Sequence, residues 1–309
     1  MSGAGGRRVV ELSPESRRLV AAVTGGLVPT VAHVEGPDGL PLRCLVWGGD
    51  AGRTVVLIHG NGGHAHWWDP VVPALVPGWR VVVPDVRGHG ESGWPPEPRY
   101  RVQDFAADLD AVLAALAPPP IALVGHSMGG RVTAWYASEH PEAVTHLGLL
   151  DTRMDRIRAE YAAKHRGRVD AGKREGTRAY PTYADAVAAF RFVPKEPDVP
   201  PAVVADLAHH AVCERGPGDW GFRFDRAVLA LEGDGADDLA DRLGRIACPT
   251  WLAAGADSWV LYAEQRTRMA DRLARCTVEV FPGGHHFLVA HGEATGRALR
   301  RFLDGAPVV

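Results

Sequence analysis

A chain of 309 residues, 46% hydrophobic and 23% charged, is long enough for one large domain and too apolar for extensive disorder. Its net charge of −3 offers no basic field for nucleic acid, and no apolar run approaches the roughly 18 residues that a membrane span needs. The first residues show no secretory signal, and the four cysteines lie too far apart for a redox or zinc motif. We therefore expect a cytoplasmic protein that binds neither nucleic acid nor membrane, and we leave homo-oligomerisation open.

Strand and helix signals alternate along most of the chain. Residues 14–24 have helical periodicity, and the turn Gly36-Pro37-Asp38-Gly39 predicts a hairpin between strands at 30–35 and 40–47. Buried strands are predicted at 54–58 and 80–84, and further strands at 121–124, 147–150, 249–254 and 277–281. Helices are predicted at 102–117, 131–138, 262–275 and 292–303. This alternation predicts an α/β fold with a mainly parallel sheet of eight strands flanked by helices.

The pattern changes between residues 152 and 243. This stretch is rich in Arg, Ala, Asp and Glu, contains several prolines near residue 200, and lacks the signals of buried strands. We expect it to form an inserted helical cap above the strand ends. The core would then comprise residues 1–151 and 244–309.

The stretch Gly125-His126-Ser127-Met128-Gly129 lies directly between a predicted strand and a predicted helix. A serine at the tip of such a sharp turn needs small neighbours, because the turn crowds them and forces the serine into unfavourable backbone angles. Gly125 and Gly129 supply this room. The pattern therefore makes Ser127 a candidate nucleophile.

Two further residues that suit this chemistry follow other predicted strands. Asp257 comes just after the strand at 249–254, and His285 follows the strand at 277–281. A serine hydroxyl is a weak nucleophile unless an imidazole accepts its proton, and the imidazole needs an acid to orient it. The chain order Ser127, Asp257, His285 is the order in which this chemistry is built on an α/β-hydrolase sheet.

The chain resembles the α/β-hydrolase superfamily from about residue 31 to residue 303. The resemblance rests on matching stretches along the core: His59-Gly60, Asp85-Val86-Arg87-Gly88-His89-Gly90-Glu91-Ser92, Gly125-His126-Ser127-Met128-Gly129-Gly130, His140-Pro141-Glu142 and Gly284-His285. It implies that Ser127 is the nucleophile and His285 the general base. It also implies an oxyanion hole formed by the backbone N–H groups of Asn61 and Met128.

Two assignments have alternatives. The family usually places its acid where this chain has Ser258, one residue after Asp257, and some relatives carry it after the strand that follows the elbow helix, where Asp151 stands. The run Pro282-Gly283-Gly284-His285 resembles the thioesterase-like form of the family and selects His285, whereas the commoner Gly-x-Gly-His form selects His286. We expect the substrate pocket to be lined by a set of histidines and aromatic residues: His64, Trp67, His126, Trp220, Phe222 and Trp259.

The resemblance predicts a hydrolase without a metal or other cofactor. It would cleave a carboxylic ester or thioester of a small, largely apolar molecule through an acyl-enzyme. One alternative is hydrolysis of a carbon–carbon bond next to a ketone, which the same triad supports. Another is a non-hydrolytic cyclase or ligand-binding protein with the same fold.

Overall fold

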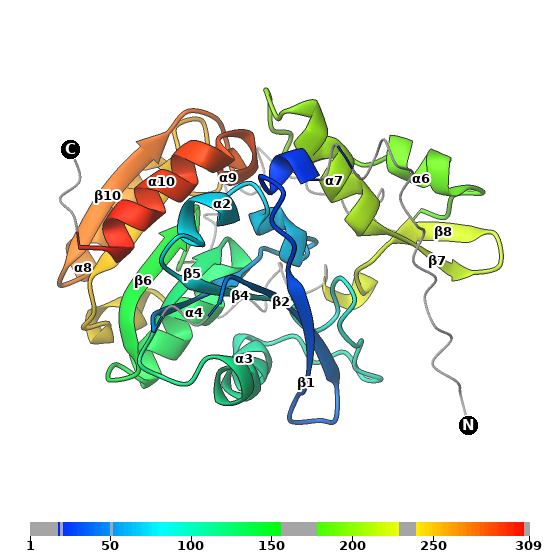
Figure 1. Cartoon of the computed structure of the whole chain (residues 1–309). Coiled ribbons are helices and arrows are strands. Elements are labelled where there is room, and N and C mark those ends of the chain that lie inside the picture. Colours follow the sequence, from blue (N-terminus) through cyan, green and yellow to red (C-terminus); the bar gives the residue numbers. More distant parts are fainter. Residues whose placement is uncertain (1–17, 19–20, 50–51, 156–177, 229–238, 306–309) are drawn as a thin grey trace.

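A computed structural model describes residues 18, 21–49, 52–155, 178–228 and 239–305. Its central feature is a sheet of eight strands in the order β1-β2-β4-β3-β5-β6-β9-β10 (Figure 1). The strands are β1 (Thr30–Glu35), β2 (Pro41–Trp47), β3 (Thr54–Ile58), β4 (Arg80–Pro84), β5 (Ile121–His126), β6 (Val144–Leu150), β9 (Thr250–Gly255) and β10 (Cys276–Phe281). All eight predicted strands are therefore present.

Most of this sheet is parallel. The β1–β2 and β2–β4 pairs are antiparallel, and every other neighbouring pair in the sheet is parallel. The sheet confirms the predicted mainly parallel architecture. Because the carboxyl ends of parallel strands meet at one edge, the loops after β3, β5, β6, β9 and β10 gather there.

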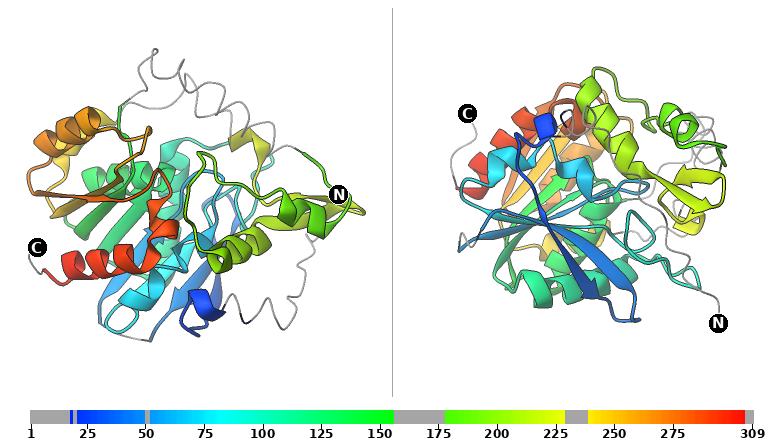
Figure 2. Two further views of the ribbon diagram at one scale, coloured as in Figure 1. Left: turned by 90° about the horizontal axis from the view of Figure 1, so that it is seen from above. Right: turned by 45° about the vertical axis from the view of Figure 1, so that its right-hand side comes forward.

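Helices cover both faces of the sheet (Figures 1 and 2). On one face lie α3 (Val102–Leu116), α4 (Met128–Glu139) and α8 (Ala263–Arg272), next to the 3-10 helix η3 (Ala240–Arg245). On the other lie the 3-10 helix η1 (Ala65–Trp68), α2 (Val72–Leu75), α9 (Phe287–Ala290) and α10 (Gly292–Leu303). Alternate residues of β3 enter the two cores, Val56 and Ile58 on the α3 side and Val55 and Leu57 on the α10 side.

The inserted segment, residues 152–243, contains α6 (Tyr183–Ala188) and α7 (Pro201–Ala211), followed by an antiparallel pair, β7 (Val212–Gly216) and β8 (Asp219–Phe222). These elements lie together at one side of the molecule (Figure 1). Our prediction of helices alone therefore missed a two-stranded sheet, although the turn Gly216-Pro217-Gly218, with φ 71° at Gly218, is a hairpin signal. Residues 156–177 and 229–238 of this segment lie outside the described residues, as does most of the helix predicted at 14–24, of which 21–23 are helical.

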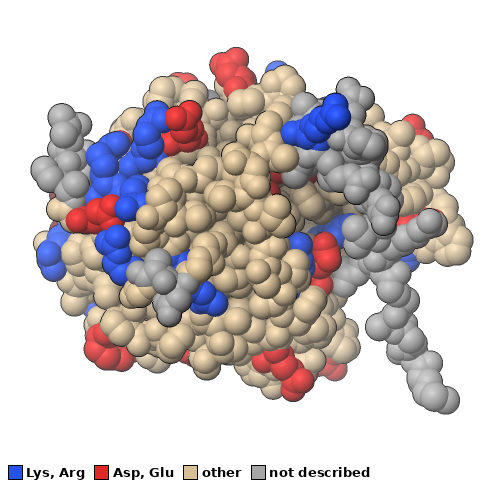
Figure 3. All heavy atoms as spheres, viewed as in Figure 1, with Lys and Arg blue, Asp and Glu red and all other residues tan. Residues whose placement is uncertain are grey.

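The surface charges and the lengths of the helices can be compared with the near-neutral net charge and the absence of a long apolar run in the sequence. On the face seen in Figure 3, basic and acidic side chains are interspersed around a broad uncharged area. Among the described residues, no helix combines the length and the apolar character needed to cross a membrane.

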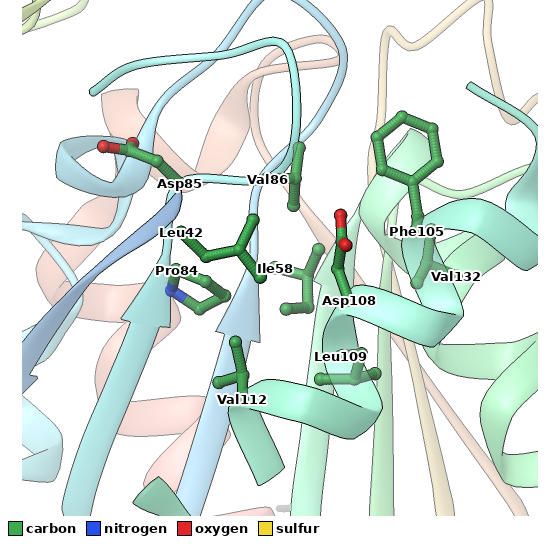
Figure 4. Close-up of a pocket in the computed structure, with 10 residues that line it drawn as sticks. All are labelled: Leu42, Ile58, Pro84, Asp85, Val86, Phe105, Asp108, Leu109, Val112 and Val132. Carbon is green, nitrogen blue, oxygen red and sulfur yellow. The ribbon is translucent and has the colours of Figure 1, made fainter. Parts of the chain in front are cut away.

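A small cavity lies between the sheet and α3 (Figure 4). Its lining is mostly aliphatic and comes from β2, β3, the end of β4 with the loop after it, α3 and α4: Leu42, Ile58, Pro84, Asp85, Val86, Phe105, Asp108, Leu109, Val112 and Val132. Ser127 is not among these residues. We therefore regard the cavity as a packing gap in the core, separate from the candidate site.

Asp108, at the edge of this cavity, forms a buried ion pair with Arg87. Both guanidinium contacts, Nε to Oδ2 and Nη2 to Oδ1, measure 2.6 Å. Arg87 is 1% exposed, and its other acid, the partly exposed Asp38, lies 3.7 Å from Nη1. Losing Asp108 would therefore leave a buried guanidinium without its hydrogen-bonded counter-ion. We expect Asp108→Ala to lower the free energy of unfolding by about 3–5 kcal/mol.

Urea denaturation of the whole chain measures this loss. The matched control is Gln103→Ala, an exposed position on the same helix, which we expect to change stability by less than about 0.5 kcal/mol. Equal stability of the Asp108→Ala and Gln103→Ala proteins would contradict the role given to the pair.

Candidate active site

Ser127 occupies the sharp turn between β5 and α4. Its backbone angles, φ 54° and ψ −116°, are unfavourable for a residue with a side chain. The surrounding glycines permit this turn: a Cβ on Gly125 would lie 2.3 Å from the carbonyl of Gly129, and one on Gly129 would lie 2.3 Å from the carbonyl oxygen of Ile58. The predicted elbow is therefore built by close backbone packing against β3.

His285 lies next to this serine. Its Nε2 is 3.0 Å from Ser127 Oγ, and its Nδ1 is 3.0 Å from Asp151 Oδ1. If Nδ1 carries the proton and donates to the carboxylate, Nε2 is free to accept the proton of the hydroxyl. Three side chains that follow β5, β6 and β10 thus form one continuous chain of hydrogen bonds.

Asp151 is buried and accepts several hydrogen bonds. It is fully buried just after β6, at φ 43°. Besides the imidazole it has two donors: the backbone N–H of Gly255 at 2.9 Å and the hydroxyl of Ser258 at 2.5 Å. Ser258, at the position where the family usually has its acid, therefore supports the carboxylate of Asp151.

The expected position of Asp257 beside the histidine is not what the structure shows. Asp257 is exposed in the loop after β9, where its backbone N–H donates to the carbonyl of Gly283 at 2.9 Å. The carboxylate that contacts His285 belongs to Asp151, our alternative. The physical reason is local: the loop turns at residues 256–258 so that the Ser258 side chain, and not that of Asp257, is directed inward.

His286 and His126 are packed around the base. His286 is buried, with its ring centroid 5.0 Å from that of Trp67, and it is His285 that meets Ser127. The His126 Nε2–H donates to the carbonyl of His285 at 2.9 Å. Burial, reinforced by the neighbouring His285, holds the pKa values of His126 and His286 well below the ordinary value, so both rings are neutral.

These three histidines could geometrically hold a metal ion. However, both ring nitrogens of His285 are already engaged by Ser127 and Asp151, and His126 is engaged by the backbone of residue 285. The arrangement suits proton transfer from Ser127 to His285, with Asp151 orienting the imidazole, better than metal binding.

The loop after β3 reaches the serine. A Cβ on Gly60 would lie 3.1 Å from Ser127 Cβ, so this loop touches the elbow. Two histidines fix the loop: His59 Nε2 accepts from the backbone N–H of Val86 at 3.1 Å, and His89 Nε2 accepts from that of Gly62 at 3.0 Å.

The two predicted oxyanion residues belong to the segments that meet at the elbow turn. Asn61 follows Gly60 in this loop, and Met128 begins α4, where a first-turn N–H has no acceptor within the helix. Both are thus neighbours in sequence of residues at the elbow, Gly60 and Ser127, and their role as oxyanion donors stays a prediction.

The predicted pocket residues fall into two groups. Trp67 and His126 lie at the site, with stacked rings whose centroids are 6.3 Å apart. His64 lies behind them and donates Nε2–H to the carbonyl of Leu207 on α7 at 3.1 Å. Two others pack against aromatic residues of the inserted segment: Trp220 against Tyr183, and Phe222 against Tyr180 and Phe190. Trp259 follows Ser258, the residue whose hydroxyl donates to Asp151.

Two residues of the inserted segment were missed. The ring of Phe192 lies 5.7 Å from the rings of both Trp67 and His286. The carboxylate of Glu196 accepts two backbone N–H groups on either side of the base, from Gly284 at 2.7 Å and from His286 at 2.8 Å. Neither residue follows a strand of the sheet or belongs to a motif, so the sequence alone offered no signal for them.

Comparisons with known proteins agree with this fold. A sequence model described as alpha/beta hydrolase fold matches residues 53–182. The chain is 32% identical over 266 residues to the protein named "Putative carbamate hydrolase RutD" of Variovorax paradoxus, covering 85% of this chain and 96% of that protein. It is 30% identical over 239 residues to Esterase Rv0045c of Mycobacterium tuberculosis, covering 77% and 76% of the two chains.

A similar solved structure is that of E-2-(acetamidomethylene)succinate hydrolase. The match has a TM-score of 0.77 and 22% identity, and it covers 90% of this chain and all of that one. At this identity it shows the fold alone. Together with the relatives of 30% identity and more, these matches show that the chain belongs to the α/β-hydrolase family.

Proposed function

We propose that this protein is a serine hydrolase that cleaves a carboxylic ester or thioester through an acyl-enzyme, with Ser127 as nucleophile, His285 as general base and Asp151 as the acid. The observation that carries the proposal is the continuous chain of contacts, 3.0 Å from Ser127 Oγ to His285 Nε2 and 3.0 Å from His285 Nδ1 to Asp151. This chain of hydrogen bonds has the geometry for proton transfer from a serine to a histidine, which a protein that only binds a ligand does not require.

In the first half-reaction, Ser127 Oγ attacks the carbonyl carbon while its proton passes to His285 Nε2. The tetrahedral oxyanion is stabilised by the N–H groups of Asn61 and Met128, an effect worth about 3 kcal/mol for each donor. The imidazolium, stabilised by buried Asp151, returns the proton to the leaving alcohol or thiol as the carbon–oxygen or carbon–sulfur bond breaks.

In the second half-reaction, water attacks the acyl-enzyme. His285 takes a proton from the water and then donates one to Ser127 Oγ, so that the carboxylic acid leaves and the enzyme is restored.

The substrate class follows from the walls of the site. Trp67, Phe192 and the neutral rings of His126 and His286 are mutually packed and provide an aromatic surface with no net charge. We therefore propose a small, largely apolar substrate.

A carbamate ester is a second candidate, favoured by the 32% identical relative whose printed name is a carbamate hydrolase. The same steps would then pass through a carbamoyl-enzyme. A matched series of 4-nitrophenyl acetate, butyrate and N-methylcarbamate, with a thioester and a vinylogous diketone alongside, distinguishes the candidates by kcat/KM.

The test of the hydrolase proposal is active-site labelling. We expect a fluorophosphonate probe to form one adduct on the purified chain, located at Ser127 by mass spectrometry, and Ser127→Ala to abolish both the adduct and ester cleavage. Ser138 and Ser258 serve as internal controls, because their hydroxyls donate to the carbonyl of Trp135 and to the carboxylate of Asp151. A folded wild-type protein that stays unlabelled, or is labelled only elsewhere, would refute the proposal.

A further inference from the structure

A second cluster of histidines and carboxylates lies between the inserted segment and the core. His66 belongs to η1, and Asp69 follows that helix. Asp206 and His210 lie four residues apart on α7, which contacts η1, so their side chains share one face of the helix. The cluster therefore joins two parts of the chain that are about 140 residues apart in sequence.

The contacts within this cluster are short. His66 Nδ1 is 2.8 Å from Asp69 Oδ2, and His210 Nε2 is 3.4 Å from Asp206 Oδ1. The rings of His66 and His210 are stacked, with centroids 3.4 Å apart and planes inclined by 6°. One donor atom from each of His66, Asp206 and His210 lies within 4.8 Å of the others.

The carboxyl group of Asp206 is buried with few hydrogen-bond partners. The residue is 0% exposed, and neither of its oxygens forms a well-aligned hydrogen bond with a nitrogen donor among the described residues. Its two polar neighbours among these residues are His210, whose Nε2 lies 3.4 Å from Oδ1, and the carboxyl group of Asp69. Asp69, the neighbouring acid, also has a buried oxygen, Oδ1, without a donor. Burial and the proximity of Asp69 raise the pKa of Asp206. Two buried acids side by side need either a shared proton or a cation between them.

We propose that His66, Asp206 and His210 bind a divalent zinc ion, with Asp69 as the fourth ligand. Two imidazoles with two carboxylates form a donor set that suits zinc, and four-coordinate bonds of about 2.0–2.1 Å hold ligand atoms about 3.3 Å apart. The 2.8 Å and 3.4 Å separations lie close to that value.

The charges around the cluster determine which ring nitrogen of His66 would bind the ion. Arg43 Nη2 lies 3.4 Å from Nε2 of His66, and this guanidinium is paired with Asp85 at 3.1 Å. The cation therefore binds on the Nδ1 side, next to Asp69 and away from Arg43. Binding turns the two stacked rings apart, so that both lone pairs point at one ion.

An ion bound at this site would link α7 to η1, because its ligands come from both elements. Trp67, adjacent to His66, contacts His126 and His286 in the candidate active site. An ion at the cluster would thus steady one wall of the substrate pocket without contacting the reacting groups.

The experiment uses the full-length, untagged protein, dialysed against a chelator and then titrated with zinc sulfate by calorimetry. We expect one equivalent to bind and the thermal midpoint to rise by several degrees, because an ion that binds only the folded chain stabilises it. Asp206→Asn and His210→Ala should each weaken zinc binding at least 100-fold and remove the thermal shift. His209→Ala is the matched control, since His209 lies beside His210 but contacts Tyr183, with its Nδ1 2.7 Å from the hydroxyl.

Two results would overturn the inference. One is the absence of zinc binding and of any thermal shift in the wild-type protein, which is the outcome if the two acids share a proton. The other is unchanged zinc binding in Asp206→Asn, a nearly isosteric variant chosen because it preserves packing even if His210→Ala fails to fold.

Discussion

Asp151→Asn is expected to lower kcat by about 10⁴, whereas Asp257→Asn should remain close to wild type. Asparagine carries no charge to stabilise the imidazolium, and it replaces one of the two acceptor oxygens with an NH₂ donor. When that NH₂ faces Nδ1 of His285, the ring must carry its proton on Nε2, which then cannot accept the serine proton. Asp257 is exposed and makes no side-chain contact with His285 among the described residues.

Asp→Asn removes the negative charge and keeps nearly the same side-chain shape, so the two variants test the role of the charge at each position. Asparagine tolerates positive φ, so the backbone at residue 151, with φ 43°, is retained in the variant. Ester hydrolysis under saturating substrate measures kcat, and thermal melting verifies that both variants fold. A large loss in Asp257→Asn with near-normal Asp151→Asn would return the acid to the loop after β9.

The fold was predictable because its signals are local. Most strands of the parallel sheet contain a short apolar run, such as Val55–Ile58, and helices alternate with them along the chain. The nucleophile turn was predictable for the same reason: Gly125 and Gly129 are needed at fixed spacing from Ser127, and the structure shows which backbone atoms each would otherwise strike.

The acid was harder to predict, because a one-residue difference in a loop decides which side chain faces inward. Asp257 and Ser258 are neighbours, yet only Ser258 reaches the site, where its hydroxyl supports Asp151 from another strand. Spacing alone does not reveal the direction of a side chain in an irregular turn.

Contacts from the inserted segment could not be predicted at all. The pairing of His66 with His210 and of Glu196 with the turn around His285 depends on how α7 and its preceding loop lie on the core. No periodic pattern or motif specifies that arrangement, since it arises from packing between residues far apart in sequence.

Glu196→Gln is expected to reduce kcat by about 10- to 100-fold with little change in KM. The two oxygens of Glu196 accept the N–H groups of Gly284 and His286, which flank the base, whereas a glutamine would place its own NH₂ against one of these donors. The unpaired N–H costs about 1–3 kcal/mol, and the turn that carries His285 shifts to relieve it. A displacement of even 1 Å at a reacting group can cost about 10² in rate.

Steady-state kinetics and the rate of fluorophosphonate labelling measure this effect together. Both should fall by a similar factor, because both require His285 to activate Ser127, while substrate binding to the aromatic walls is retained. Asp198→Asn is the matched control: it is exposed, lies two residues away and has φ 59°, which asparagine tolerates. An unchanged labelling rate in Glu196→Gln would show that the His285 turn holds its position without this carboxylate. If Glu196→Gln and Asp198→Asn change kcat and KM by the same factors, the effect belongs to the loop as a whole and not to the Glu196 carboxylate.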